Sequence, residues 1–277
     1  MLQTSAAGRG STLSLGPSPE TIVQAYSIPA TYRYRYNGFE SLRDIFARIW
    51  ADLPNNRLRY IAIIGFNSEN LLELERRGLR DSLPKFTALV DDNSETMIVK
   101  FMPGVLHDRI SRTLFYNILS RIERLGMRRQ IVMSGSGRMS FPNGLHKEPD
   151  EQIKPASRNN LHDYPTFVIE VGVSETIRQL RQDARLWLVN TNGRTKIVLL
   201  ISVDVHRKIL RFERWQDSPA NVQQLEYHHN GTHLTGAPLV NPADLLFDSV
   251  PPNLPAGEIS IDHQSLLEFG AAVFFDS

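Results

Sequence analysis

Residues 147–155 read KEPDEQIKP, and residues 164–187, after a polar loop, read YPTFVIEVGVSETIRQLRQDARLW. The second segment contains the apolar run 167–173, in which the one charged residue is Glu170. A charge inside such a run is costly unless an opposite charge or a metal ion compensates it. Either an opposite charge elsewhere in the chain or a metal ion must therefore compensate Glu170.

The elements around Glu170 alternate between strand and helix. The run 167–173 is apolar along its length, which is typical of a central strand that is covered on both faces. Ser174 is a suitable N-cap for a helix that reaches about residue 189, and residues 195–203 read as a second buried strand. A helical crossover between two strands of one sheet makes those strands parallel.

The segments before this unit extend the pattern. Residues 106–125 carry an apolar stripe at helical spacing, and residues 96–102 and 130–133 read as strands. Residues 79–94 read as a polar connection that contains Pro84. Residues 147–153 read as a strand beside 167–173, which brings Asp150 towards Glu170.

These elements predict an α/β protein with a mixed central sheet flanked by helices. Downstream, Asn230-Gly231 is a strong signal for a hairpin turn between two strands. The expected organisation is a disordered N-terminus at 1–20, an N-terminal elaboration packed on the core at 21–95, the core at 96–216 and a β-rich C-terminal extension at 217–277.

Composition narrows the classes of protein. The chain has 277 residues and no cysteine, which excludes disulfides, thiolate zinc sites and cysteine nucleophiles. Its net charge of +1 argues neither for nor against a polyanionic partner. No apolar run is long enough to span a membrane, and the first residues lack a secretory signal. We therefore expect an intracellular protein, cytoplasmic or nuclear, with no membrane partner.

Two carboxylates on neighbouring strands suggest a metal site. Asp150 and Glu170 would repel each other at close range unless one took up a proton or a cation lay between them. A hard divalent ion such as Mg²⁺ or Mn²⁺ suits such a pair, with the backbone carbonyl of Val171 as a third oxygen ligand.

The alternative is an inert ion pair between Glu170 and the following helix. Arg178, Arg181 and Arg185 form a stripe beside the apolar face of that helix, and their long stems allow the guanidinium groups to reach the end of the sheet. The residues alone leave both interpretations open.

The order Pro149-Asp150, Glu170 in an apolar strand, then a helix resembles the PD-(D/E)XK restriction-endonuclease-like superfamily. More closely, it resembles a family of uncharacterised fungal proteins. The similarity covers about residues 96–215 and includes VKFMPGVLHD, GSGRMS, KEPDEQIKP, PTFVIEVGVSET and RQDARLWL.

The resemblance implies a restriction-endonuclease-like core that hydrolyses phosphodiester bonds of nucleic acid with Mg²⁺ or Mn²⁺. Asp150 and Glu170 would be the metal ligands, and an acid on the first core helix, here Asp108, sometimes assists.

One departure from the superfamily pattern bears on activity. The motif lysine belongs two residues after the glutamate, where this chain has Gly172. Arg178 or Arg181 could substitute, although an arginine stays protonated and cannot act as a base. Three functions remain open: a metal-dependent nuclease, a catalytically degenerate nuclease fold that binds a protein or a nucleic acid, or an enzyme of another class.

Overall fold

The computed structural model describes residues 19–53, 60–102, 105–173, 176–217, 220–252, 254 and 257–275. Most of the segment expected to be disordered, 1–18, lies outside these residues, while 19 and 20 begin a helix. In the described part of the chain, no helix is both long and apolar enough to cross a membrane.

A mixed core sheet carries Glu170. Within the described residues it has seven strands in the order β13-β12-β11-β10-β9-β8-β5. Their bounds are β5 (Ile131–Met133), β8 (Glu151–Pro155), β9 (Phe167–Val173), β10 (Ile197–Asp204), β11 (Ile209–Asp217), β12 (Ala220–His228) and β13 (His233–Thr235). The expected parallel pair is confirmed, because β9 and β10 run parallel while their outer neighbours pair antiparallel.

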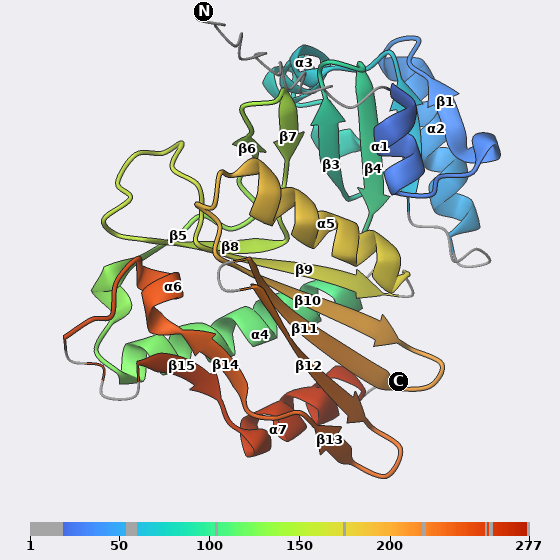
Figure 1. The fold of residues 1–277 in the computed structure, drawn as a ribbon. Coiled ribbons are helices and arrows are strands. Elements are labelled where there is room, and N and C mark those ends of the chain that lie inside the picture. The colour runs from blue at the N-terminus through green and yellow to red at the C-terminus, as the bar shows by residue number, and fades with distance from the viewer. Residues whose placement is uncertain are drawn as a thin grey trace, which may run out of the picture.

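Helices cover the two faces of this sheet, which confirms the mixed α/β fold (Figure 1). Helix α4 (Val105–Arg124) packs through Ile110, Leu114 and Ile118 on the face that carries Ile169. Helix α5 (Ile177–Asn190) packs through Leu180, Ala184 and Trp187 on the opposite face, which carries Glu170. The expected N-cap Ser174 lies outside the described residues, and Thr176 is the residue at the start of α5.

A second, N-terminal sheet packs beside α5. Across the described ranges it has six strands in the order β1-β2-β4-β3-β7-β6. Their bounds are β1 (Arg33–Arg35), β2 (Tyr60–Ile64), β3 (Phe86–Asp91), β4 (Thr96–Phe101), β6 (Met139–Ser140) and β7 (Leu145–Lys147). Helices α1 (Pro19–Ala25), α2 (Phe39–Asp52) and α3 (Ser68–Arg76) pack on this sheet, and residues 30–32, 80–82 and 128–130 form short 3-10 turns.

Two expectations about strands were wrong. Residues 79–94 are not only a connection, because they include the fully buried strand β3. The expected boundary at 95/96 therefore falls in the hairpin between β3 and β4, whose residues pair from Phe86–Phe101 to Asp91–Thr96. Residues 147–153 form no continuous strand either: β7 ends at Lys147 in the N-terminal sheet, and β8 begins at Glu151 in the core sheet.

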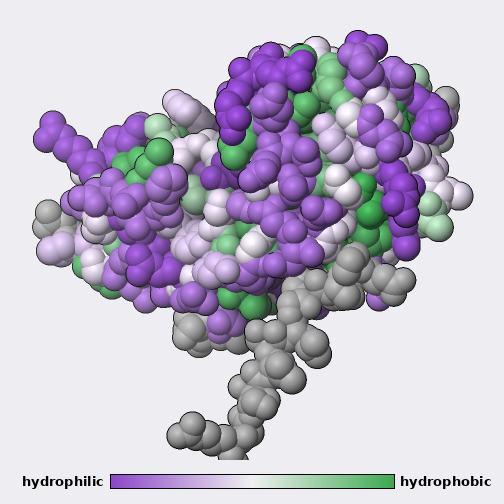
Figure 2. All heavy atoms as spheres, turned by 90° about the horizontal axis from the view of Figure 1, so that it is seen from above, coloured by the Kyte–Doolittle hydropathy of each residue, from purple (hydrophilic) through white to green (hydrophobic). Residues whose placement is uncertain are grey.

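The C-terminal segment closes the far side of α4. Strands β14 (Leu239–Pro242) and β15 (Glu258–Ile261) pair with each other, and α6 (Ala243–Phe247) and α7 (His263–Val273) pack with them under α4. The expected hairpin at Asn230-Gly231 joins β12 to β13, with His228 opposite His233. Seen from above, the molecule is mostly hydrophilic, and apolar side chains gather in a few patches (Figure 2).

Candidate metal centre

Glu170 lies on β9 with its side chain fully buried between the core sheet and α5. The Trp187 indole N–H donates to Glu170 Oε1 at 2.7 Å. The ammonium of Lys147, at the end of β7, lies 3.2 Å from the same oxygen. The partner of the charge in the apolar strand thus comes from the N-terminal sheet.

Asp150 lies in the short connection between β7 and β8, where the chain passes from one sheet to the other. Its Oδ2 atom accepts a hydrogen bond of 2.7 Å from the backbone N–H of Val171. The same oxygen lies 3.2 Å from Nε2 of His107, on the first turn of α4. These contacts hold the carboxylate beside the strand that carries Glu170.

Lys100 lies between the two acids. Its Nζ atom donates to the carbonyl oxygen of Val171 at 2.7 Å and lies 3.4 Å from Asp150 Oδ2. It is 3.9 Å from Glu170 Oε2. Lys100 therefore faces the three oxygen groups that the sequence suggested for a divalent ion.

A third buried acid completes the group. Asp183 on α5 lies 2.7 Å from Lys147 Nζ and accepts hydrogen bonds from the hydroxyls of Tyr26 and Tyr60. We call Lys100, Lys147, Asp150, Glu170 and Asp183 the buried charge cluster; all are less than a tenth exposed. It joins the N-terminal sheet, the core sheet and α5.

The pKa values of the two acids are shifted in opposite directions. Burial, opposed by Lys147 and aided by Asp183 and Asp150, raises the pKa of Glu170 to about 7. Burial alone would raise the pKa of Asp150 as well, but Lys100, His107 and the Val171 N–H hold that pKa well below its usual range. The pair therefore holds a charged Asp150 beside a carboxyl group, Glu170, that binds a proton more readily than usual.

The donor atoms fit a hard divalent ion. Asp150 Oδ1 and Glu170 Oε2 are both buried and make no hydrogen bond in the structure. Carboxylate and carbonyl oxygens are the ligands that Mg²⁺ and Mn²⁺ prefer. Among the described residues, however, no three His, Cys, Asp or Glu side chains converge closely enough to hold a metal. Protein ligands would thus be the acidic pair and the Val171 carbonyl, with water for the remaining positions.

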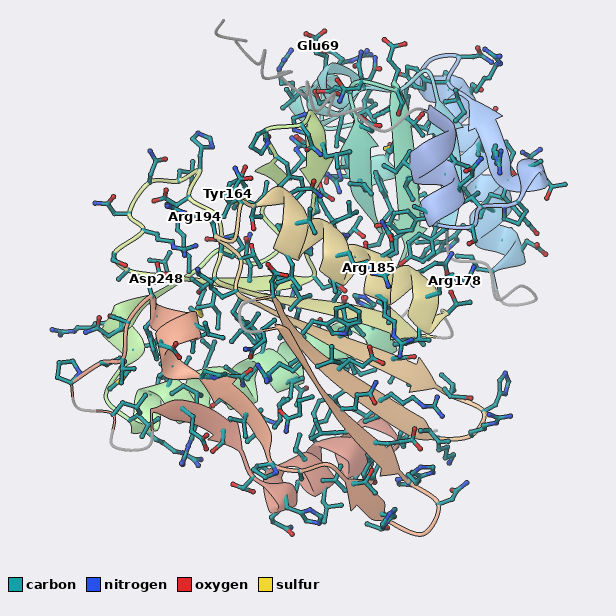
Figure 3. All side chains as sticks on the ribbon, in the orientation of Figure 1. Glu69, Tyr164, Arg178, Arg185, Arg194 and Asp248 are labelled. Carbon is teal, nitrogen blue, oxygen red and sulfur yellow. The ribbon has the colours of Figure 1, made fainter. Side chains whose placement is uncertain are left out.

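The other residues suggested by the sequence lie outside this cluster. Asp108 pairs with Lys85 at 2.5 Å, and the ring of His107 lies between Asp108 and Asp150. Arg178 is exposed near the N-terminal end of α5 (Figure 3). Arg181 binds Glu213 on β11 through two hydrogen bonds of 3.0 and 2.6 Å.

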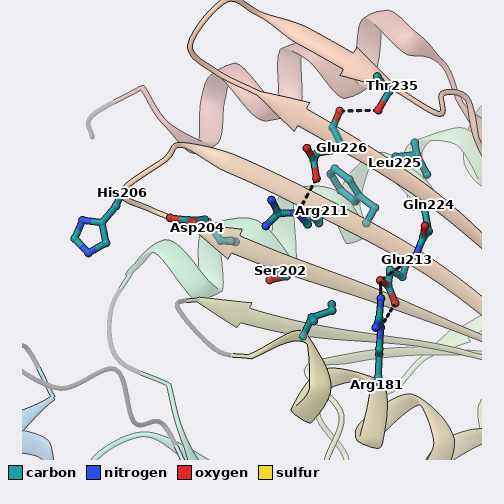
Figure 4. A pocket seen from close by; sticks show the side chains of 13 residues that line it. Arg181, Ser202, Asp204, His206, Arg211, Glu213, Gln224, Leu225, Glu226 and Thr235 are labelled. Atoms are coloured by element: carbon teal, nitrogen blue, oxygen red, sulfur yellow. Dashed lines mark hydrogen bonds and ion pairs between the residues drawn. The ribbon is translucent and has the colours of Figure 1, made fainter.

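Arg181 borders an open groove of about 810 Å³ on the part of the core sheet that α5 leaves uncovered. The groove also contains Asp204, His206 and the pair Arg211–Glu226 (Figure 4). The suggested ion pair between Glu170 and an arginine of α5 is therefore wrong: in the part of the chain that the structure describes, the cations nearest Glu170 are Lys147 and Lys100.

Sequence reasoning missed both lysines. Lys100 lies in the apolar strand TMIVKF, so it carries the same signal that marked Glu170, a charge inside a buried run. Lys147 is next to the acidic segment EPDE, in a stretch where the sequence predicts one strand that also carries Asp150. What the sequence did not reveal is that the N-terminal sheet faces the core sheet at this point.

No protein-family model matches the chain, and no curated protein matches it. The chain is similar to a solved structure from Anabaena variabilis ATCC 29413, described as a "putative nuclease belonging to DUF820". The two are 14% identical, with a TM-score of 0.44, over 66% of this chain and 90% of that one. This likeness assigns no role to any residue of the buried charge cluster.

Proposed function

We propose that the chain is a nuclease of the restriction-endonuclease-like type, which hydrolyses phosphodiester bonds of nucleic acid with Mg²⁺ or Mn²⁺. The observation that carries this proposal is the acidic pair: Asp150 and Glu170 approach the same ammonium group, and each has one buried oxygen without a hydrogen-bond partner. Unsatisfied buried acceptors are rare in folded proteins and call for an ion, a water or a catalytic role.

The cluster residues have separate tasks in this proposal. Asp150 and Glu170 would hold the ion, which when bound supplies an activated water and offsets charge on the phosphoryl group. The Val171 N–H and His107 keep Asp150 charged and oriented. Trp187 and Lys147 hold the Glu170 carboxylate through its Oε1 atom. Its Oε2 atom would then be available for the ion.

A second function, a catalytically silent module that binds a protein or a nucleic acid, is favoured by one observation. The side chains of Asp150 and Glu170 are each 1% exposed, and Lys100 compensates both. A buried acidic pair that already has a cation needs no metal to be stable. The two functions differ in whether the wild-type chain cleaves a phosphodiester bond.

A nuclease assay separates them. Purified chain is incubated with Mn²⁺ or Mg²⁺ and with single- and double-stranded DNA and RNA, beside Asp150→Asn and Glu170→Gln. We expect cleavage that EDTA abolishes and that each substitution lowers by several orders of magnitude. Glu213→Gln is the matched control, because it neutralises a buried, cation-paired acid on the same sheet. No cleavage by any of them would reject the nuclease in favour of the silent module. Equal cleavage by wild type and both cluster variants would reject the acidic pair as the active site.

A further inference from the structure

The ammonium of Lys100 lies where the proposed divalent ion would bind. It is within 3.9 Å of Asp150 Oδ2, Glu170 Oε2 and the Val171 carbonyl oxygen. An ammonium group donates hydrogen bonds to the same oxygen types that coordinate Mg²⁺ or Mn²⁺. The same three groups therefore serve two alternative cations, and Lys100 uses Oδ2 of Asp150 while Oδ1 makes no hydrogen bond.

The two cations cannot be held there together without a large repulsion. At about 4 Å inside a protein, like charges repel far more strongly than in water. With Lys100 and Lys147 charged, the cluster's three acids exceed its cations by one, so a divalent ion added beside both lysines would reverse the sign of the cluster.

We propose that Lys100 is a built-in counter-ion that occupies the divalent-ion position in the metal-free protein and competes with the ion for it. The inference rests on the proposed function for the position of the metal. Binding of the ion then requires the ammonium to move away from these oxygens, which the flexible four-carbon stem of a lysine allows.

Lys147 is the internal comparison. It is as buried as Lys100 and also contacts Glu170, but through Oε1, the oxygen that Trp187 already occupies. Its shorter contact, 2.7 Å, is to Asp183. Lys147 thus neutralises the far side of the cluster and is not at the proposed ion position.

The test is the affinity for Mn²⁺ alone, measured by calorimetry on the full chain without nucleic acid. Lys100→Met removes the competing charge and keeps most of the side-chain volume, so we expect affinity to rise roughly tenfold or more over wild type. Lys147→Met is expected to change affinity less, because its charge lies on the other side of Glu170. Lys100→Gln, which retains a donor for the Val171 carbonyl, replaces Lys100→Met if that variant does not fold in EDTA.

Each outcome has a distinct meaning. Equal or weaker Mn²⁺ binding by the neutral Lys100 variants, with wild-type binding intact, overturns the counter-ion role and leaves the proposed nuclease standing. Binding by the Lys100 variants but not by wild type supports the counter-ion role. It would also mean that the lysine has replaced the metal, and it would reject the proposed nuclease function. Absence of binding by every variant rejects both the counter-ion role and the metal site.

Discussion

Two glutamates on one face of the core sheet have nearly the same kinds of neighbour and opposite behaviour. Glu170 on β9 and Glu213 on β11 both pair with Leu200 on the strand between them. Each accepts a tryptophan N–H, from Trp187 and Trp215 respectively, and each has a cation beside it. Yet the pKa of Glu170 is raised to about 7, whereas Arg181 and Trp215 outweigh burial and lower the pKa of Glu213.

Deeper burial of Glu170 and the hydrogen bonding at the second oxygen of each glutamate together explain the difference in pKa. Glu213 accepts from Arg181 on both oxygens and from Gln224 as well, so its charge is fully satisfied. Glu170 Oε2 has no hydrogen bond, and its other neighbours include two further acids. An inert ion pair and a candidate cation site can therefore share residue types and differ in depth of burial and in one unsatisfied oxygen.

Removal of the cation beside each glutamate should give the largest difference in stability between the two sites. Lys147→Met leaves Glu170 and Asp183 buried without their shared cation, and we expect the free energy of unfolding to fall by roughly 3–5 kcal/mol. Arg181→Met should cost roughly 0.5–1.5 kcal/mol, because Arg181 is 39% exposed and Glu213 keeps its other donors. Urea denaturation measures the free energy of unfolding of both variants. Equal losses would contradict the claim that Glu170 depends on its cation more than Glu213 does.

The pH dependence of stability should have opposite signs at the two glutamates. Below about pH 4.5 Glu170 is protonated in the folded and in the unfolded chain. Between about pH 4.5 and pH 7 the unfolded chain has lost this proton, while the folded chain still holds it. The folded state is then penalised as pH rises, by on the order of 3 kcal/mol over the whole window. Glu213, with its lowered pKa, instead contributes stability that is present above its unfolded pKa and lost as pH falls through the folded one.

Denaturation in EDTA between pH 5 and 8 measures this dependence. We expect Glu170→Gln to lose the component of stability that falls with rising pH, and Glu213→Gln to retain it. The same decline in wild type and Glu170→Gln would mean that Glu170 is charged throughout and that its burial is fully compensated.

Loss of the tryptophan donor should have a smaller effect at Glu170 than loss of the cation Lys147. Trp187→Phe leaves Glu170 Oε1 with Lys147 alone, and we expect roughly 1–3 kcal/mol of lost stability, part of it from the smaller ring in a fully buried site. Trp215→Phe should cost less, since Trp215 is only partly buried and Arg181 still binds both oxygens of Glu213. Thermal unfolding of the two variants compares them directly, and a larger loss at Trp215 would contradict the assignment of Glu170 as the less satisfied acid.

The elements around Glu170 could be predicted because local sequence patterns determine them. The strand 167–173, the helix after it and the parallel pairing with β10 follow from an apolar run, helical spacing and a crossover. Strand β3 was missed because Pro84 and the polar residues around 92–95 outweighed its short apolar run FTALV.

The partners of the acidic pair depend on contacts between distant segments. Lys100 is 50 residues from Asp150 in the chain. The two side chains meet because Lys100 lies on β4 of the N-terminal sheet, and Asp150 lies in the connection that leads from β7 of that sheet to the core sheet. No spacing or periodicity encodes that approach. The sequence does mark Lys100 and Glu170 as charges in apolar strands, and such charges must find each other or an ion.

The most direct test of the acidic pair is a crystal structure of the chain soaked in Mn²⁺, with data collected for anomalous scattering. We predict a manganese peak between Asp150, Glu170 and the Val171 carbonyl oxygen, with the Lys100 ammonium displaced from its contacts with all three. A structure with Lys100 in place and no manganese at this position would contradict the metal centre.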